Sequence, residues 1–235
     1  GVQIYRQLNV EPTDAGKTKA ASRAVLQPDD ETILTRKFDS WLASRQKGFE
    51  NRQVPVFIFA VQGGGIYAAS AGATLLARLQ DRCPGFASQV FAVSGVSGGA
   101  VGTVVFNAVV DSLPNALPPP CRQVGEQGEE KVTKLVRQVL RQDHLAPVGM
   151  FIVPDLLGKI GWGRGMGRSK ALETGLALAL AGLPLDGRAE RAVTARFAGH
   201  WNERSRFPAP IVNTTWVETG FRVAFAPFAL KPTGD

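Results

Sequence analysis

The chain has 235 residues, 44% of them hydrophobic and 20% charged, a balance that is typical of a globular domain and excludes a broadly disordered chain. Its net charge of +7 favours anionic partners, although charge alone does not distinguish nucleic acid from an anionic membrane surface. No run of 18 apolar residues occurs, so the pattern predicts no helix that spans a bilayer.

The first half of the chain predicts alternating helices and buried strands. Residues 1–30 are polar, lack a clear period and are expected to be irregular. Five elements are predicted after them: a helix over 31–49, a strand over 54–61, a helix over 66–80, a strand over 89–96 and a helix over 98–113. The strand–helix–strand order predicts a crossover in a parallel sheet, so the fold class is α/β.

The second half begins with a proline-rich loop at 113–120. An amphipathic pattern predicts a helix over 126–143, and another helix is predicted over 169–181. The stretches PIVNTTWV and FRVAFAPF predict two strands joined by a turn at 218–220. The length fits a single domain over 1–235. Cys83 and Cys121 have neither metal-ligand spacing nor a disulfide framework, and both are expected to be free thiols.

Ser97 lies in a glycine-rich turn between the second predicted strand and the next helix. The residues Gly95-Val96-Ser97-Gly98-Gly99 fit the pattern G-x-S-x-G. In that context Gly95 and Gly99 allow a sharp turn that lifts the serine hydroxyl above the sheet edge, at a helix N-terminus. Ser97 is therefore a candidate nucleophile.

A second glycine turn, Gly63-Gly64-Gly65, ends the preceding strand and also opens a helix. Because parallel strands place their carboxyl ends at one edge of a sheet, the two turns are expected to lie side by side. Glycine backbone presents N–H donors without a side chain in the way, which suits an oxyanion hole. Gly63, Gly64, Gly65 and Gly98 are the candidate donors.

The two glycine turns together resemble those of the patatin-like phospholipases. The stretch QGGGIYAASAG is followed by SGVSGGAVG, 34 residues separate Gly63 from Ser97, and the similarity extends over roughly residues 54–228. The resemblance implies a three-layer fold whose central, mostly parallel sheet is flanked by helices. It also implies a serine lipid acyl hydrolase that cleaves phospholipid or other acyl esters and uses no metal or organic cofactor.

The chain departs from this family pattern at three points. Gln62 replaces the acidic residue before the glycines, and Tyr67 stands where many members carry an arginine. The family uses a Ser–Asp dyad whose aspartate follows the late strands in an Asp-Gly turn, whereas Asp186-Gly187 precedes those strands. The catalytic aspartate is therefore expected beyond Asp235, with the domain incomplete at its C-terminus.

Two other functions fit the same residues. A Ser–His–Asp esterase would combine Ser97 with Asp155 or Asp186 and with His200, although His200 lies in a polar, arginine-rich segment that favours the surface. His144 follows a predicted helix, where it is expected to interact with the helix C-terminus. Alternatively, the glycine turns cradle an anion in a non-catalytic α/β module.

The stretch from Met150 to Lys170 mixes apolar and cationic side chains. This mixture suits an anionic membrane interface, with core packing as the alternative. Membrane association is expected, either peripheral or through an anchor in segments outside this chain. The candidate membrane-interface residues are Trp162, Arg164, Met166, Arg168 and Lys170. No nucleic-acid-binding motif occurs and the basic residues form no stripe, so no nucleic-acid partner is expected.

Overall fold

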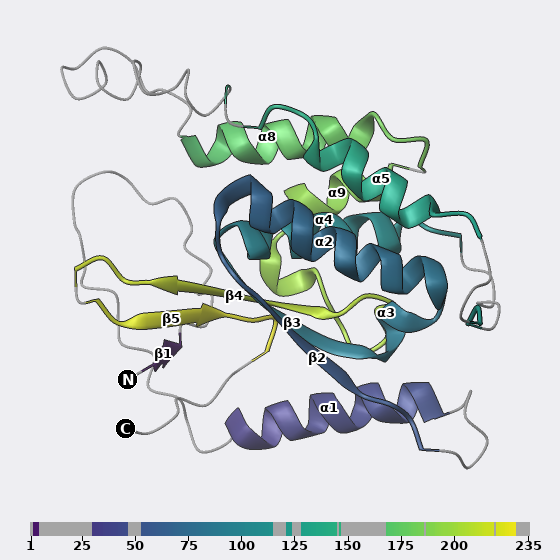
Figure 1. Ribbon diagram of the computed structural model, residues 1–235. Coiled ribbons are helices and arrows are strands. Elements are labelled where there is room, and N and C mark those ends of the chain that lie inside the picture. Colours follow the sequence, from purple (N-terminus) through teal and green to yellow (C-terminus); the bar gives the residue numbers. More distant parts are fainter. Residues whose placement is uncertain are drawn as a thin grey trace.

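The computed structural model describes a five-stranded sheet with helices on both of its faces (Figure 1). The described residues are 2–4, 30–46, 53–114, 121–123, 128–144, 146, 168–185, 187–218 and 220–228. The strands are β1 (Val2–Ile4), β2 (Phe57–Val61), β3 (Val90–Val96), β4 (Ala209–Thr215) and β5 (Arg222–Phe225). They lie in the order β1-β5-β4-β3-β2.

Most strand pairs are parallel, as the strand–helix–strand pattern predicts. β2 pairs with β3, β3 with β4 and β1 with β5 in parallel, whereas β4 and β5 are antiparallel. The antiparallel pair is the predicted hairpin, closed by a 2.8 Å hydrogen bond from the Trp216 N–H to the Phe221 carbonyl. The α/β class is therefore confirmed.

The helices cover the sheet unequally. α1 (Asp30–Gln46) lies below the sheet in Figure 1, and most other helices lie above it. These are α2 (Gly65–Arg82), α4 (Gly98–Asp111), α5 (Lys131–Leu140), α8 (Arg168–Ala181) and α9 (Arg188–Thr194); α3 (Phe86–Gln89) is a single turn before β3. Within the described residues, none of the helices is long and apolar enough to cross a bilayer.

The core lies between β3 and the helices packed on it. Val93 and Phe106 are fully buried at the centre, where α4 covers β3. On the other face, α1 docks through Trp41, whose fully buried ring packs edge-on against Phe91 at 5.3 Å between centroids. Burying a side chain of this size stabilises the fold by roughly 2–3 kcal/mol, so Trp41 anchors α1 to the sheet.

Several elements differ from the sequence-based expectation, and the sequence patterns did not predict the short helices α3 and α9. Val2–Ile4, within the segment expected to be irregular, form β1 against β5. The helix predicted over 126–143 begins at Lys131, because the Asp81 carboxylate accepts 2.8 Å hydrogen bonds from the Val132 and Thr133 N–H groups. These donors have no intrahelical partner, so a carboxylate from the end of α2 fixes where α5 starts.

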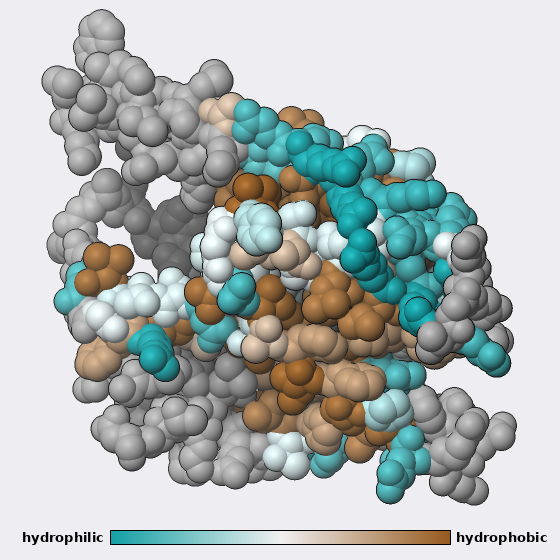
Figure 2. All heavy atoms as spheres, viewed as in Figure 1, coloured by the Kyte–Doolittle hydropathy of each residue, from teal (hydrophilic) through white to brown (hydrophobic). Residues whose placement is uncertain are grey.

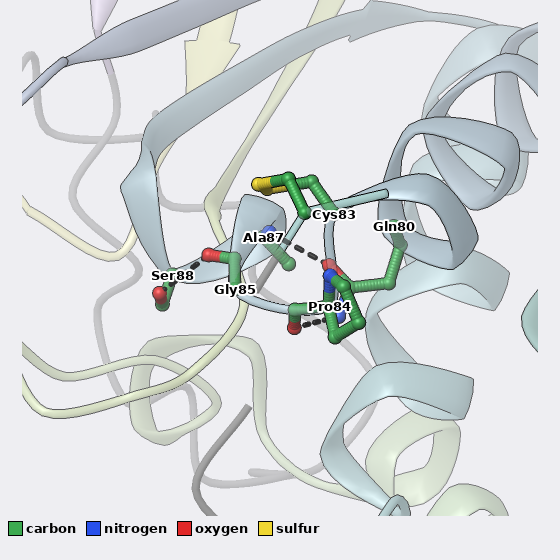
Figure 3. Close-up of a disulfide and its surroundings, with 7 residues drawn as sticks. Gln80, Cys83, Pro84, Gly85, Ala87 and Ser88 are labelled. Carbon is green, nitrogen blue, oxygen red and sulfur yellow. Dashed lines mark hydrogen bonds between the residues drawn. A yellow bond between two sulfur atoms is a disulfide. The ribbon is translucent and has the colours of Figure 1, made fainter. Parts of the chain in front are cut away.

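The expectation of two free thiols is wrong, because Cys83 and Cys121 form a disulfide (Figure 3). The chain after the proline loop returns to the end of α2, where the Arg122 N–H donates to the Arg82 carbonyl at 2.9 Å. On the Cys83 side, the Gln80 amide fixes the turn into α3 and accepts a 2.8 Å hydrogen bond from the Ala87 N–H. The cysteines, 38 residues apart, are therefore held together by contacts that neither sequence neighbourhood reveals.

Replacing both cysteines with serine is expected to lower the free energy of unfolding by about 3–4 kcal/mol. The cross-link restricts the unfolded chain, and a loop of 38 residues corresponds to a stabilisation of about this size. Urea unfolding of both proteins with and without reductant measures the effect. Reductant should lower the urea midpoint of the wild type and leave that of the double variant unchanged. A wild-type midpoint that is the same with and without reductant would contradict the prediction.

Candidate functional site

Ser97 occupies a strained turn at the end of β3. Its backbone has φ 50° and ψ −122°, and among the described residues it is the one non-glycine residue with a positive φ. Such a conformation costs roughly 1–3 kcal/mol and persists where the surrounding structure enforces it. Ser97 is exposed, whereas Gly95, Gly98 and Gly99 around it are buried. The strain thus presents the hydroxyl to solvent at the N-cap of α4.

Close packing explains the glycines on either side of Ser97. A Cβ atom on Gly95 would lie 2.7 Å from the Ala100 Cα and backbone N, and a Cβ on Gly99 would lie 2.5 Å from the Gln62 carbonyl oxygen. Both distances fall well inside van der Waals contact, and the atoms approached belong to backbone that cannot rotate away. The spacing G-x-S-x-G is therefore required by the turn itself.

The triple-glycine turn lies directly against Ser97, as predicted from the parallel strand order. β2 and β3 run in register with Val61 opposite Gly95, so both strands end at one edge of the sheet. A Cβ on Gly63 would stand 3.4 Å from the Ser97 Cβ, and a Cβ on Gly98 would overlap the Gly65 carbonyl. Gly64 and Gly65 have φ values of 142° and 59°, a backbone conformation that residues with a side chain rarely adopt.

Two helix N-termini meet at this point. The Gly64 carbonyl accepts the first hydrogen bond of α2, from Ala68, and the Ser97 carbonyl accepts those of Ala100 and Val101 in α4. The N–H groups of Gly65 and Gly98 therefore precede the first intrahelical donors. Neither helix has a side-chain cap or an acidic residue in its first turn. Two positive helix ends thus converge beside the Ser97 hydroxyl with no first-turn carboxylate to neutralise them.

Residues 53–110, which form this half of the site, contain few charged side chains. Between Gln53 and Val110 the charged residues are Arg78, Asp81 and Arg82, and all three belong to the last turns of α2, away from the glycines. The exposed side chains beside the two turns include the polar Gln62 and the apolar or aromatic Ile66, Tyr67 and Val96. In Figure 2 the hydrophobic side chains of β2 and α2 form a continuous patch at the centre of the view. Within the described residues, the surroundings of Ser97 are therefore mostly uncharged.

The structure does not bring His200 to Ser97. His200 interacts electrostatically with Asp111, the last residue of α4. Its ring lies 5.3 Å from the ring of Phe207, which precedes β4. Ser97 caps the opposite end of the same helix, and 14 helical residues span about 20 Å. Burial lowers the pKa of His200, and Asp111 only partly opposes this shift. The triad partners Asp155 and Asp186 lie outside the described residues.

His144 has the structural role predicted for it. The side chain is buried, and its Nε2 lies 2.8 Å from the Val139 carbonyl in the last turn of α5. A side-chain hydrogen bond to one of the last carbonyls of a helix stabilises that end. His144 therefore completes α5.

The candidate membrane-interface residues are only partly described. Trp162, Arg164 and Met166 lie outside the described residues, and Arg168 is the first residue of α8. Lys170 is exposed and forms an ion pair with Glu173, so its charge is compensated by a neighbouring acid. The pair is solvent-exposed and contributes little to stability.

Asn213 contacts the end of β3 at this edge of the sheet, which the sequence patterns did not predict. It lies near the end of β4 and donates hydrogen bonds to Ser94 and Gly95 of β3. The only sequence signal for this contact was a polar residue near the carboxyl end of a predicted strand. That signal is weak, because the sequence does not show which strand lies beside it.

The arrangement places an exposed hydroxyl beside two helix N-termini that have no side-chain cap. Comparisons with protein-family models, with curated proteins and with solved structures found no match to this chain. The geometry of the site therefore carries the functional conclusion.

Proposed function

We propose that the protein is a serine hydrolase of carboxylic esters, a lipid acyl hydrolase of the phospholipase A or esterase type with patatin-like architecture. One observation carries the proposal: Ser97 is held in a strained, exposed turn where the N-termini of α2 and α4 meet. Strained backbone concentrates at functional sites, and helix N-termini stabilise the negative charge that develops in acyl transfer.

In the proposed mechanism, the Ser97 Oγ attacks the ester carbonyl carbon and passes its proton to a carboxylate base. The negative charge on the former carbonyl oxygen is stabilised by N–H groups of Gly63, Gly64, Gly65 and Gly98. Collapse of the tetrahedral intermediate breaks the ester C–O bond, and the alcohol leaves with the proton held by the base. Water, deprotonated by the same carboxylate, then attacks the acyl-serine, releases the fatty acid and restores Ser97.

The base is proposed to be an aspartate beyond residue 235. Asp81 is bound to the N-terminus of α5, and Asp111 ends α4, a helix length from Ser97. The late hairpin of β4 and β5 lies beside β3, and the resemblance places the dyad aspartate after such a hairpin. A turn that follows β5 and returns to the carboxyl edge would supply the carboxylate.

The alternative functions have weaker support. A module that permanently binds an anion would ordinarily place a cation at the glycine turns, but residues 53–77 and 84–110 contain none. Backbone donors alone suit a charge that exists only during the reaction. A histidine triad would need a base at Ser97, whereas His200 lies at the other end of α4.

Covalent trapping tests the proposal. The full-length protein is incubated with an alkyl fluorophosphonate, whose phosphorus is attacked by an activated serine with loss of fluoride. Mass spectrometry of the digested protein is expected to show one phosphonate, on the peptide that contains Ser97. His200→Ala should be labelled at the wild-type rate. No labelling, or labelling elsewhere, would overturn the proposal, and loss of labelling in His200→Ala would favour the triad.

Membrane association is part of the proposal. Trp162 and Met166 next to Arg164 and Arg168 suit an anionic lipid interface, where each cation contributes about 1 kcal/mol. Arg164→Glu combined with Arg168→Glu is expected to weaken binding to vesicles that contain phosphatidylserine by at least about tenfold, while hydrolysis of a soluble short-chain ester is retained. Lys170→Glu serves as the comparison, because Lys170 is already paired with Glu173 and should contribute less. Equal co-sedimentation of wild type and double variant would mean that this stretch only packs.

A further inference from the structure

Asn213 stands where the two halves of the sheet meet. It is the last residue of β4 that pairs with β3, opposite Val96, and on its other side it pairs with Ala224 of β5. Ser94 and Ile211 form a pair two residues earlier, so Ser94, Val96 and Asn213 share one face of the sheet. Asn213 is thus one rung from the strained turn at Ser97.

The side-chain amide of Asn213 binds the strand segment that leads into this turn. Its Nδ2 donates a 2.8 Å hydrogen bond to the Ser94 Oγ and a 3.2 Å hydrogen bond to the Gly95 carbonyl. An amide nitrogen has two N–H donors, so both are used, on residues three and two positions before Ser97. Asn213, Ser94 and these contacts are partly buried, which limits competition from water.

The opposite side of Gly95 is fixed by packing. The Ala100 Cα and backbone N would stand 2.7 Å from a Cβ on Gly95, so α4 presses directly on this residue. Gly95 is therefore held between α4 on one side and the Asn213 amide on the other. A residue with φ 50° and ψ −122° keeps that conformation only while its neighbours enforce it.

We propose that Asn213 is a positioning residue that locks the carboxyl end of β3 and so holds the Ser97 hydroxyl in its reactive orientation. The inference rests on the proposed function, since the orientation matters only if Ser97 is the nucleophile. Asn213 acts through Gly95 and Ser94 and does not itself contact the substrate. Its loss should therefore slow the chemical step and leave substrate binding unchanged.

The test compares Asn213→Ala and Asn213→Asp with wild type in the full-length protein. Aspartate keeps the shape of asparagine but cannot donate to the Gly95 carbonyl, so both variants lose this contact. We expect kcat for a soluble p-nitrophenyl ester to fall about 10- to 100-fold, KM to stay within about twofold, and the rate of fluorophosphonate labelling at Ser97 to fall in parallel with kcat. Asn202→Ala, which removes an asparagine bonded to backbone in the turn before β4, should retain wild-type kcat.

The possible results separate this inference from the proposed function. A wild-type protein that is not labelled at Ser97 refutes the function, and the positioning role with it. A labelled wild type whose Asn213 variants have unchanged kcat, or lose efficiency through KM alone, refutes only the positioning role. If neither Asn213 variant folds, Ser94→Ala removes one of the two acceptors; it should lower kcat about three- to tenfold with an unchanged melting temperature, and an unchanged kcat overturns the inference.

Discussion

Ser97→Ala is expected to lower kcat for ester hydrolysis by at least about 10³-fold in the full-length protein. Removal of a nucleophile abolishes the covalent route, and only the acceleration from binding and the oxyanion hole remains. The melting temperature should change little, because the hydroxyl is exposed and forms no hydrogen bond within the described residues. Steady-state hydrolysis of a p-nitrophenyl ester, together with thermal unfolding, measures both quantities.

Ser88→Ala is the matched control for this substitution. The Ser88 hydroxyl donates a 2.7 Å hydrogen bond to the Gly85 carbonyl in α3, before the amino end of β3. The Ser88→Ala substitution removes a serine hydroxyl from the opposite edge of the sheet and should leave kcat within about twofold of wild type. Retention of more than a tenth of the wild-type kcat by Ser97→Ala would mean that another residue performs the attack.

Gly98→Ala is expected to lower kcat/KM by at least about 100-fold and to destabilise the fold by about 1–3 kcal/mol. The new Cβ would overlap the Gly65 carbonyl, a backbone group that moves only if α2 and α4 separate. Forcing extra volume into close packing costs energy of this size, and a displacement near 1 Å can cost about 100-fold in rate. Kinetics and urea unfolding of the same preparations separate the two effects.

Gly199→Ala provides the comparison with the same added methyl group. No heavy atom lies within 4 Å of a Cβ built on Gly199, and its φ is not positive. It should match wild type in both activity and stability. If Gly98→Ala kept kcat/KM within about threefold of wild type, the close contact between the two turns would not be needed for catalysis.

Local sequence patterns were enough to predict the unit that presents Ser97. Residues 54–113 show two apolar strand patterns, two helical patterns and two glycine turns, and the structure has β2, α2, β3 and α4 in these places with parallel pairing. The reason is local. Apolar strand runs, helical periods and glycine positions fix backbone conformation over a few residues. A short crossover between the two strands then leaves both glycine turns at one edge of the sheet.

The contacts between segments far apart in the chain could not be predicted from local patterns. Cys83 pairs with a cysteine 38 residues away, Asp81 starts α5 across 51 residues, and Asn213 reaches Ser94 across 119. The amino-acid type at each position is compatible with many partners, and only the packing of helices and strands selects one. His200 shows the same limit: its residue type and chain order suit a catalytic base, but the length of α4 places it at the wrong end of the helix that Ser97 caps.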